Sequence, residues 1–402
     1  MSLADRDSAV LWHPYTQMET APAPLEIARA QGVWLFTEDG RRILDGVSSW
    51  WVNIHGHSHP KLNAALAAQA AELEHVIFAG CTHRPAVELA EQLLNVLPPG
   101  LARVFYSDNG STAVEAAIKM ALQYWRNRGE PRTKFAALAG AYHGDTVGAM
   151  SVSARSVFTA AFEPLMFDVA HFASLEELEA LLKDGLAAVL IEPMLQGAGG
   201  MRMWPTAFVR GVRELCDRYD TLLIADEVLT GFGRTGKMFA CEHAGIAPDI
   251  ICLSKGLTAG YMPLGATVTT AAIYEAFLSD DRGKTFFHGH SYTANPLACA
   301  VGIASLQLFK EEPVLENVAR LERQMRAALE PLKGRVMGGV GVVEVQGDGY
   351  LDNIGPRLAA EFLQRGLLLR PLGNVVYFMP PYCITESETE WALEQIRYTL
   401  KL

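Results

Sequence analysis

Short apolar segments alternate with amphipathic segments of helical period between residues 85 and 270. Six apolar segments are predicted to be strands: 103–107, 135–138, 187–192, 221–226, 249–254 and 265–269. Segments that are apolar throughout are typical of strands whose sheet is covered on both faces. Because helices are predicted between the strands, over residues 112–125 and 206–219 for example, the pattern predicts an α/β fold around a largely parallel sheet.

The pattern changes after Asn295 and Pro296. Helices are expected near residues 297–310 and after Pro313, and strands near 340–345 and 375–379 flank a further helix. This change predicts a second, smaller α/β domain, while the proline-containing start of the chain reads as an arm. We therefore predict three parts: an N-terminal arm over residues 1–50 that contributes to the small domain, a large domain over residues 51–300, and a C-terminal small α/β domain over residues 301–402.

Composition excludes several classes of protein. Half of the 402 residues are hydrophobic, a fifth are charged, and the net charge is -11, as expected of a folded globular chain. Nucleic-acid binding requires clustered Lys and Arg, which an acidic balance argues against. The first residues lack the apolar core of a signal peptide, and no uninterrupted apolar run is long enough to cross a bilayer. We expect a cytoplasmic protein that binds neither nucleic acid nor membrane.

Neither the cysteines nor the histidine-rich segment predicts a metal site. The six cysteines are scattered without a Cys-x-x-Cys pair, so we expect reduced core residues. His55, His57 and His59 alternate, and alternate residues of an extended strand point the same way. Because Gly56 and Pro60 interrupt this segment and no cysteine or acid is close to it in sequence, a structural turn is favoured over a metal site.

A possible phosphate site follows the predicted strand 103–107. Asp108-Asn-Gly-Ser-Thr112 leads into a predicted helix. Gly110 allows close approach of the backbone, Ser111 offers a hydroxyl group, and a helix N-terminus presents free N–H groups to an anion. The same residues are equally typical of an ordinary helix cap, so this segment alone leaves both interpretations open.

Two neighbouring predicted strands end in charged residues that could act on a ligand. One strand ends at Asp226, and the next is followed by Lys255. Open α/β sheets bind ligands at the carboxyl ends of their strands. Desolvation favours the neutral, nucleophilic form of a lysine, and an aspartate can keep a pyridine nitrogen protonated. Considered by itself, this pair is more often an ion pair at the rim of a sheet.

The turn after strand 135–138 adds an aromatic side chain. Tyr142, in Ala141-Tyr-His-Gly-Asp145, could lie against the flat ring of a cofactor. A tyrosine in a turn often only packs against its neighbours. Together with a phosphate cradle, a lysine and an aspartate, however, it completes the set of groups that binds pyridoxal phosphate.

A glycine-rich segment offers an alternative. Gly231-Phe-Gly-Arg-Thr-Gly236 matches the dinucleotide signature and follows a strand, as in a nicotinamide oxidoreductase. The segment after it is short for a crossover helix and is interrupted by Gly245, and Asp249 begins the next strand instead of ending it. Nucleotide binding is therefore disfavoured, and Arg234 is expected to make a structural or inter-subunit contact.

The chain resembles the class III, fold-type-I aminotransferases over nearly its whole length. The family pattern is carried by residues 140–145 (Gly-Ala-Tyr-His-Gly-Asp), 224–236 (Ile-Ala-Asp-Glu-Val-Leu-Thr-Gly-Phe-Gly-Arg-Thr-Gly) and 248–256 (Pro-Asp-Ile-Ile-Cys-Leu-Ser-Lys-Gly). The resemblance implies a mostly parallel seven-stranded sheet plus a smaller α/β domain, and pyridoxal 5'-phosphate as cofactor. It implies that Lys255 bonds to the cofactor, Asp226 holds its pyridine nitrogen, and Gly110 and Ser111 bind its phosphate. Tyr142 would cover the ring and contact substrate.

Other segments are similar to one branch of this family, namely residues 12–18, 45–57, 196–202, 295–300 and 370–373. The branch implies a ping-pong transfer in biotin biosynthesis from S-adenosylmethionine to 8-amino-7-oxononanoate, giving 7,8-diaminononanoate. Tyr15, Trp50, Gly289 and Arg370 would bind substrate with Tyr142. Aromatic walls suit its aliphatic chain and a guanidinium its carboxylate. Lysine as donor, or another ω-amino acid or diamine aminotransferase, remains an alternative.

The resemblance also implies a homodimer with shared active sites. The segment His288-Gly-His-Ser291 would reach the cofactor phosphate of the second subunit, so His290 and Ser291 are counted among the cofactor-binding residues. The family pattern has Pro-Thr where His290-Ser291 stands. Because Ser291 retains a hydroxyl group, the phosphate contact is expected to persist, whereas His290 has no counterpart from which to infer a role.

Overall fold

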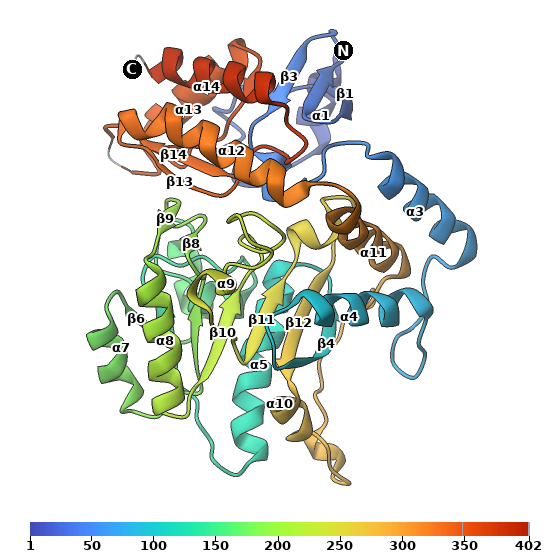
Figure 1. The fold of residues 1–402 in the computed structure, drawn as a ribbon, viewed down its shortest axis with the longest axis vertical. Helices are drawn as coiled ribbons and strands as arrows, with labels where there is room; N and C mark the ends of the chain where they lie inside the picture. Colours follow the sequence, from blue (N-terminus) through green and yellow to red (C-terminus); the bar gives the residue numbers. More distant parts are fainter. Residues whose placement is uncertain (348, 401–402) are drawn as a thin grey trace.

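The computed structural model describes residues 1–347 and 349–400 (Figure 1). Its largest sheet has seven strands in the order β4-β12-β11-β10-β7-β5-β6. The strands are β4 (Leu101–Ser107), β5 (Phe135–Leu138), β6 (Ala170–Phe172), β7 (Ala188–Ile191), β10 (Leu222–Asp226), β11 (Ile250–Leu253) and β12 (Gly265–Thr270). β12 pairs antiparallel with both β11 and β4, and all other neighbouring pairs are parallel. The predicted α/β fold with a mostly parallel seven-stranded sheet is confirmed.

Helices cover both faces of this sheet, which explains why its strands are apolar throughout. In β10, Leu222 and Ile224 pack in a cluster with α5 (Gly110–Asn127), whereas Leu223 and Ala225 pack in a second cluster on the opposite face. The second cluster includes residues of α4 (Arg84–Val96), α8 (Thr206–Arg218) and α11 (Pro296–Glu311). Helices predicted over 112–125, 206–219 and 297–310 are thus present.

Two smaller sheets lie above the large sheet in Figure 1. One has the order β1-β2-β3-β15 and the other β13-β14-β16. Their strands are β1 (Ile27–Gln31), β2 (Trp34–Thr37), β3 (Arg42–Asp45), β13 (Arg335–Met337), β14 (Val340–Glu344), β15 (Leu367–Leu368) and β16 (Val375–Phe378). Because β15 pairs in parallel with β3, the beginning and end of the chain share a sheet. The domain boundaries at residues 50 and 300 stay a prediction.

The helices beside the small sheets share their hydrophobic core. They are α12 (Val314–Leu329), α13 (Ile354–Gln364) and α14 (Glu386–Leu400). Leu321, Phe362 and Ile396, one from each helix, are buried in one cluster with Val33 and Leu44 of the N-terminal part. The remaining elements are α1 (Leu3–Val10), α2 (Ser48–Trp51), α3 (Pro60–Glu72), α6 (Val147–Val152), α7 (Leu175–Leu182), α9 (Cys241–Ala244), α10 (Ala271–Glu275), β8 (Leu195–Gln196) and β9 (Arg202–Met203).

All six cysteines are free thiols, but not all lie in the core. Cys81 and Cys383 are exposed, which corrects the expectation of six core residues. Both lie in segments without helix or strand, where a small apolar residue is not forced into a packed layer. In the described part of the chain, no helix is both long and apolar enough to span a bilayer.

The three alternating histidines make separate contacts in the protein. His57 Nε2 lies 2.9 Å from Asp45 Oδ2, and His55 Nε2 lies 3.2 Å from the Ser305 hydroxyl oxygen. His59 Nε2 lies 3.4 Å from a carboxylate oxygen of Glu312. Among residues 1–347 and 349–400, no group of three or more His, Cys, Asp or Glu side chains could hold a metal ion.

Candidate active site

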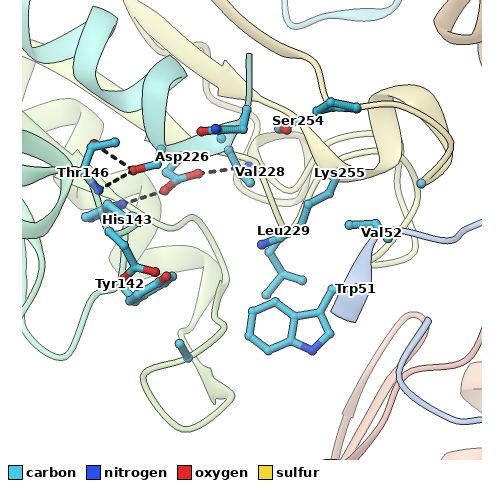
Figure 2. Close-up of a pocket in the computed structure, with 18 of the residues that line it drawn as sticks. Trp51, Val52, Tyr142, His143, Thr146, Asp226, Val228, Leu229, Ser254 and Lys255 are labelled. Carbon is cyan, nitrogen blue, oxygen red and sulfur yellow. Dashed lines mark hydrogen bonds and ion pairs between the residues drawn. The ribbon is translucent and has the colours of Figure 1, made fainter. Parts of the chain in front are cut away.

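A cavity of about 670 Å³ lies at the carboxyl ends of β10 and β11. Its lining brings together five residues predicted from the sequence: Gly110, Ser111, Tyr142, Asp226 and Lys255. Because β10 and β11 are parallel neighbours, Asp226 and Lys255 emerge at the same edge of the sheet. Figure 2 shows Tyr142 and His143 across the cavity from Lys255 and Trp51.

Lys255 presents an amine that is held only by packing. It follows β11 in a 3₁₀ turn (Lys255–Thr258) with a φ of 44°, and its Nζ lies 4.7 Å from the centre of the Trp51 ring. None of the described residues hydrogen-bonds to this amine. Burial lowers the pKa of Lys255 to about 8, although the carboxylates of Asp226 and Glu192 act in the opposite direction. A neutral fraction of the amine is therefore available near pH 7 for covalent chemistry.

Asp226 is fixed by a buried histidine. His143 Nδ1 lies 2.7 Å from Asp226 Oδ2, and the backbone N–H of Val228 donates to Asp226 Oδ1 at 3.0 Å. Burial disfavours the charged imidazolium, yet the hydrogen bond and the charge of Asp226 together raise the pKa of His143. The pair holds a carboxylate oriented toward the cavity, as a protonated pyridine nitrogen requires.

Glu192 supports the turn that carries Tyr142 and His143. It follows β7, its Oε1 accepts from the N–H of Tyr142 at 3.0 Å, and its Oε2 accepts from the N–H of Gly197 at 2.8 Å. Burial raises the pKa of Glu192 to about 7. Glu192 and His143 were not predicted from the sequence as functional residues. Glu192 stands at the carboxyl end of the next parallel strand, the same signal that singled out Asp226.

The N-terminus of α5 forms one wall of the cavity, and close packing shapes it. The N–H of Thr146 donates to the Ser111 hydroxyl oxygen at 3.0 Å. A Cβ atom at Gly144 would lie 2.4 Å from that oxygen, and one at Gly110 would lie 2.6 Å from Val228 Cγ1. Only glycine fits at either position. The free N–H groups of the helix and the Ser111 hydroxyl fit a phosphate group.

A second cavity of about 440 Å³ shares Trp51, Tyr142 and Lys255 with the first. Tyr15, Trp50 and Arg370, which were expected to bind substrate, all line it. The Arg370 guanidinium lies 4.3 Å from the centre of the Trp50 ring. No carboxylate of the described residues pairs with Arg370, so its charge is available to a ligand.

Tyr15 is anchored at this pocket by an acid. Its hydroxyl donates to Asp145 Oδ2 at 2.5 Å and lies 3.2 Å from the Tyr142 hydroxyl. Burial and the hydrogen bond to Asp145 raise the pKa of Tyr15 to about 12, so the hydroxyl stays protonated. The N-terminal segment is thereby fixed against the turn that carries Tyr142.

A left-handed turn places both tryptophans. Ser48, Ser49, Trp50 and Trp51 have φ values of 48°, 44°, 70° and 74°, a conformation that costs L-residues roughly 1–2 kcal/mol each. Side chains hold this turn in place. The Ser48 hydroxyl donates to the carbonyl of Met379 at 2.7 Å, the Ser49 hydroxyl to Asp45 Oδ2 at 2.8 Å, and the indole N–H of Trp51 to the Tyr377 hydroxyl at 3.0 Å.

The glycine-rich segment packs beneath this turn instead of binding a nucleotide. Arg234 is buried, donates to the carbonyl of Pro380 at 3.2 Å and to the Ser48 hydroxyl oxygen at 3.4 Å, and lies 4.7 Å from the centre of the Tyr382 ring. The helix that follows, α9, has four residues. Arg234 therefore makes a structural contact within the chain.

Three predicted site residues lie outside both cavities of their own chain. Gly289, His290 and Ser291 line neither of them. His290 Nδ1 lies 3.4 Å from Asp108 Oδ2, next to the start of α5.

Comparison with known proteins places the chain in one family. The model of the class III aminotransferases matches residues 15–400. The chain is 50% identical over 409 residues to the adenosylmethionine-8-amino-7-oxononanoate aminotransferase of Synechococcus elongatus, covering 94% of this chain and 96% of that protein. It is 43% identical over 443 residues to the protein of the same name from Geobacter sulfurreducens, covering 99% and 97%.

Comparison with solved structures gives the same family. The adenosylmethionine-8-amino-7-oxononanoate aminotransferase of Methanocaldococcus jannaschii superposes with a TM-score of 0.94 at 38% identity, covering 99% of this chain and 98% of that one. An omega transaminase of Pseudomonas jessenii in complex with PMP has a TM-score of 0.94 at 29% identity, with 100% and 98% covered. The resemblance drawn from the motifs is confirmed, and the chain belongs to the class III aminotransferases.

Proposed function

We propose that this chain transfers an amino group from S-adenosylmethionine to carbon 7 of 8-amino-7-oxononanoate, giving 7,8-diaminononanoate in biotin biosynthesis. The observation that carries the proposal is the pair formed by Lys255 and Asp226, which face one cavity from neighbouring parallel strands. Full-length relatives that bear the name of this activity support the choice of substrates.

The cavity fits pyridoxal 5'-phosphate. When bound, this cofactor supplies an electron sink that stabilises a carbanion at the substrate carbon. Lys255 would bond to it, the carboxylate of Asp226 would hold its pyridine nitrogen, and Gly110 and Ser111 would bind its phosphate. Tyr142 would cover the ring. The buried, unpartnered amine of Lys255 and the glycine-shaped cradle of α5 are the features that support this assignment.

Lys255 would also move the proton of the reaction. A positioned base is most effective when its pKa lies near the working pH, and burial brings the pKa of Lys255 to about 8. We propose that Nζ takes the proton from the donor carbon, which becomes a ketone, and in the second half of the reaction supplies a proton to carbon 7 of the acceptor. The neighbouring Trp51 ring lies 4.7 Å from this amine.

The second cavity would bind both substrates in turn. Arg370 suits the terminal carboxylate of 8-amino-7-oxononanoate through paired hydrogen bonds, while Tyr15 and Trp50 enclose an aliphatic chain. The same rings can receive adenine by stacking and a sulfonium cation by cation–π attraction. One pocket thus accommodates two dissimilar molecules in a ping-pong reaction.

We further propose a cytoplasmic homodimer whose subunits complete each other's sites. Gly289, His290 and Ser291 lie outside the cavity of their own chain, which supports contacts with the phosphate and substrate of a second copy. Phe287 and Tyr292 flank them and are 74% and 62% exposed, as expected of residues that a partner covers. Free thiols at all six cysteines suit a reducing compartment.

A coupled assay tests the function. The purified protein is incubated with 8-amino-7-oxononanoate and, in separate reactions, with S-adenosylmethionine, lysine, ω-amino acids and diamines, and 7,8-diaminononanoate is measured. We expect product with S-adenosylmethionine. If product forms with lysine and not with S-adenosylmethionine, lysine is the donor. Transfer from diamines or ω-amino acids to other ketones, without amination of 8-amino-7-oxononanoate, would overturn the proposal.

A further inference from the structure

Two side cavities adjoin the substrate pocket that contains Arg370. The pocket itself measures about 440 Å³. One side cavity, of about 190 Å³, contains Arg155, and the other, of about 610 Å³, contains Phe162 and Leu165. Phe158 and Asp145 line all three. Pro14 and Tyr15 also lie between the pocket and the larger side cavity, and Tyr142 and Ala198 between the pocket and the smaller one. Because Asp145 is engaged by Tyr15, the Phe158 ring is the apolar side chain that borders all three spaces.

Two aromatic contacts hold the Phe158 ring at this boundary. Its centre lies 4.5 Å from that of Tyr350 and 5.8 Å from that of Tyr15, both in edge-to-face geometry. Tyr15 and Tyr350 themselves line the substrate pocket. Such pairs are worth about 0.5–1.5 kcal/mol each beyond the area they bury. The ring is therefore fixed from the N-terminal and C-terminal parts of the chain at once.

The backbone of Phe158 is fixed as well. The N–H of Ser156 donates to the Thr159 hydroxyl oxygen at 2.9 Å, and the N–H of Phe158 donates to the Ser156 hydroxyl oxygen at 3.2 Å. The N–H of Thr159 closes the turn on the carbonyl of Ser156 at 3.1 Å. These bonds do not involve the ring, so a smaller side chain at position 158 leaves the turn intact.

The side cavities differ from the substrate pocket in their chemistry. The Arg155 guanidinium is committed to the carbonyls of Ser151, Ser153 and Phe167, at 3.0, 3.4 and 3.1 Å. The larger cavity is lined mainly by apolar side chains, among them Met150, Val157 and Phe162. Space beyond Phe158 therefore suits uncharged apolar groups, while a substrate carboxylate is drawn to Arg370.

We propose that Phe158 determines the size of substrate that the site accepts. Its ring closes one side of the Arg370 pocket, so that the pocket takes an unbranched chain there and rejects branched or aryl groups. Replacement by a smaller side chain joins the pocket to apolar space that already exists. The identity of the natural substrates rests on the proposed function, whereas the position of the Phe158 ring beside the pocket rests on the cavities alone.

The test compares Phe158→Ala with Phe162→Ala in the protein loaded with cofactor. Phe162 lines the larger side cavity but not the substrate pocket, so it is a matched control. Initial rates are measured with 1-phenylethylamine and with an unbranched amine as donors. We expect Phe158→Ala to raise the ratio of kcat/KM for the aryl amine to that for the unbranched amine by about tenfold or more, and Phe162→Ala to leave this ratio unchanged.

Binding of unreactive ligands gives a second measurement. Calorimetric titration measures the affinities for nonanoate and for a carboxylate that carries a phenyl branch. These affinities show, without turnover, whether the Phe158 ring limits the size of the ligand. We expect Phe158→Ala to weaken the binding of nonanoate and to strengthen the binding of the branched ligand. Phe158→Leu, which keeps more of the side-chain volume, should shift both affinities less and in the same direction, and it replaces Phe158→Ala if that variant does not fold.

Equal ratios in the variants at positions 158 and 162 would overturn the inference. Failure of the natural protein to aminate 8-amino-7-oxononanoate would instead overturn the proposed function, and the calorimetric comparison would still decide the role of Phe158. The two outcomes are therefore distinguishable.

Discussion

His143 Nδ1 lies 2.7 Å from Asp226 Oδ2, and both side chains are buried at the base of the candidate active site. The two residues stand 83 positions apart in the chain. His143 would act on a bound cofactor through Asp226, so it is a positioning residue. Its hydrogen bond and the charge of Asp226 raise the pKa of His143, against the effect of burial.

Loss of this contact should weaken both cofactor binding and catalysis. A hydrogen bond to a charged group is worth about 1.5–3 kcal/mol, so His143→Ala should lower kcat and cofactor affinity by about ten- to a hundredfold. His143→Asn, which can still donate to Asp226, should recover part of both. The visible absorbance of the bound cofactor, followed against pH, should shift in His143→Ala. An unshifted profile in a folded variant with reduced stability would indicate a merely structural role.

The pKa of Lys255 predicts how fast the cofactor-free chain captures pyridoxal phosphate. Only the neutral amine reacts, so the capture rate should rise about tenfold per pH unit below pH 8 and level off above it. Stopped-flow absorbance measures this rate, and Lys255→Ala, which lacks the amine, should show no covalent capture and no turnover. A rate that continues to rise beyond pH 9, as for a lysine with the ordinary pKa of 10.5, would contradict the lowered pKa.

The candidate site is predictable from the sequence where local signals coincide with the geometry of a parallel sheet. Asp226 and Lys255 follow apolar strands, and the carboxyl ends of parallel neighbours meet, so two local observations predicted one cavity. The contact between His143 and Asp226 carries no local signal because it depends on how two distant turns meet. The left-handed turn at Ser48–Trp51 was also beyond prediction, since L-residues rarely adopt it and its support comes from Arg234 and the carbonyl of Met379.

Because the left-handed turn at Ser48–Trp51 depends on distant partners, it should be sensitive to a small change. Ser48→Ala removes the hydrogen bond to Met379 and leaves its carbonyl unpaired, which should lower the free energy of unfolding by about 1–3 kcal/mol. Because Trp50 and Trp51 follow directly, KM for the acceptor should rise as well. Ser58→Ala is a suitable comparison: Ser58 also has a positive φ and donates to a carbonyl, that of Ala30, but it is exposed and lines neither cavity. Denaturant unfolding and steady-state kinetics should distinguish the two variants, and equal losses would argue against a special role for the turn.

Arg370 should act on binding more than on the chemical step. Its guanidinium lies 4.3 Å from the centre of the Trp50 ring and lines the proposed substrate pocket. Arg370→Met should raise KM for 8-amino-7-oxononanoate by about ten- to a hundredfold and change kcat less, because a charge-assisted hydrogen-bonded pair is lost. Arg370→Lys keeps the charge without the paired geometry, so its KM should lie between that of the natural protein and that of Arg370→Met. Equal KM values for the natural protein and Arg370→Met would place the carboxylate elsewhere.

Mixed dimers test whether the two subunits share their sites. Ser291→Ala should weaken cofactor binding by about tenfold or more if its hydroxyl reaches a phosphate, and Lys255→Ala should be inactive. In a dimer of one Ser291→Ala and one Lys255→Ala subunit, the intact Lys255 then faces the intact Ser291 of its partner, so one site is complete. Random assembly of equal amounts should restore about a quarter of the natural activity at limiting cofactor, because half of the two-fold symmetric dimers are mixed and each has one working site. If Ser291 served its own chain instead, the mixture would show no gain over the residual activity of its Ser291→Ala subunits, since every subunit with Lys255 would also carry the damaged phosphate contact.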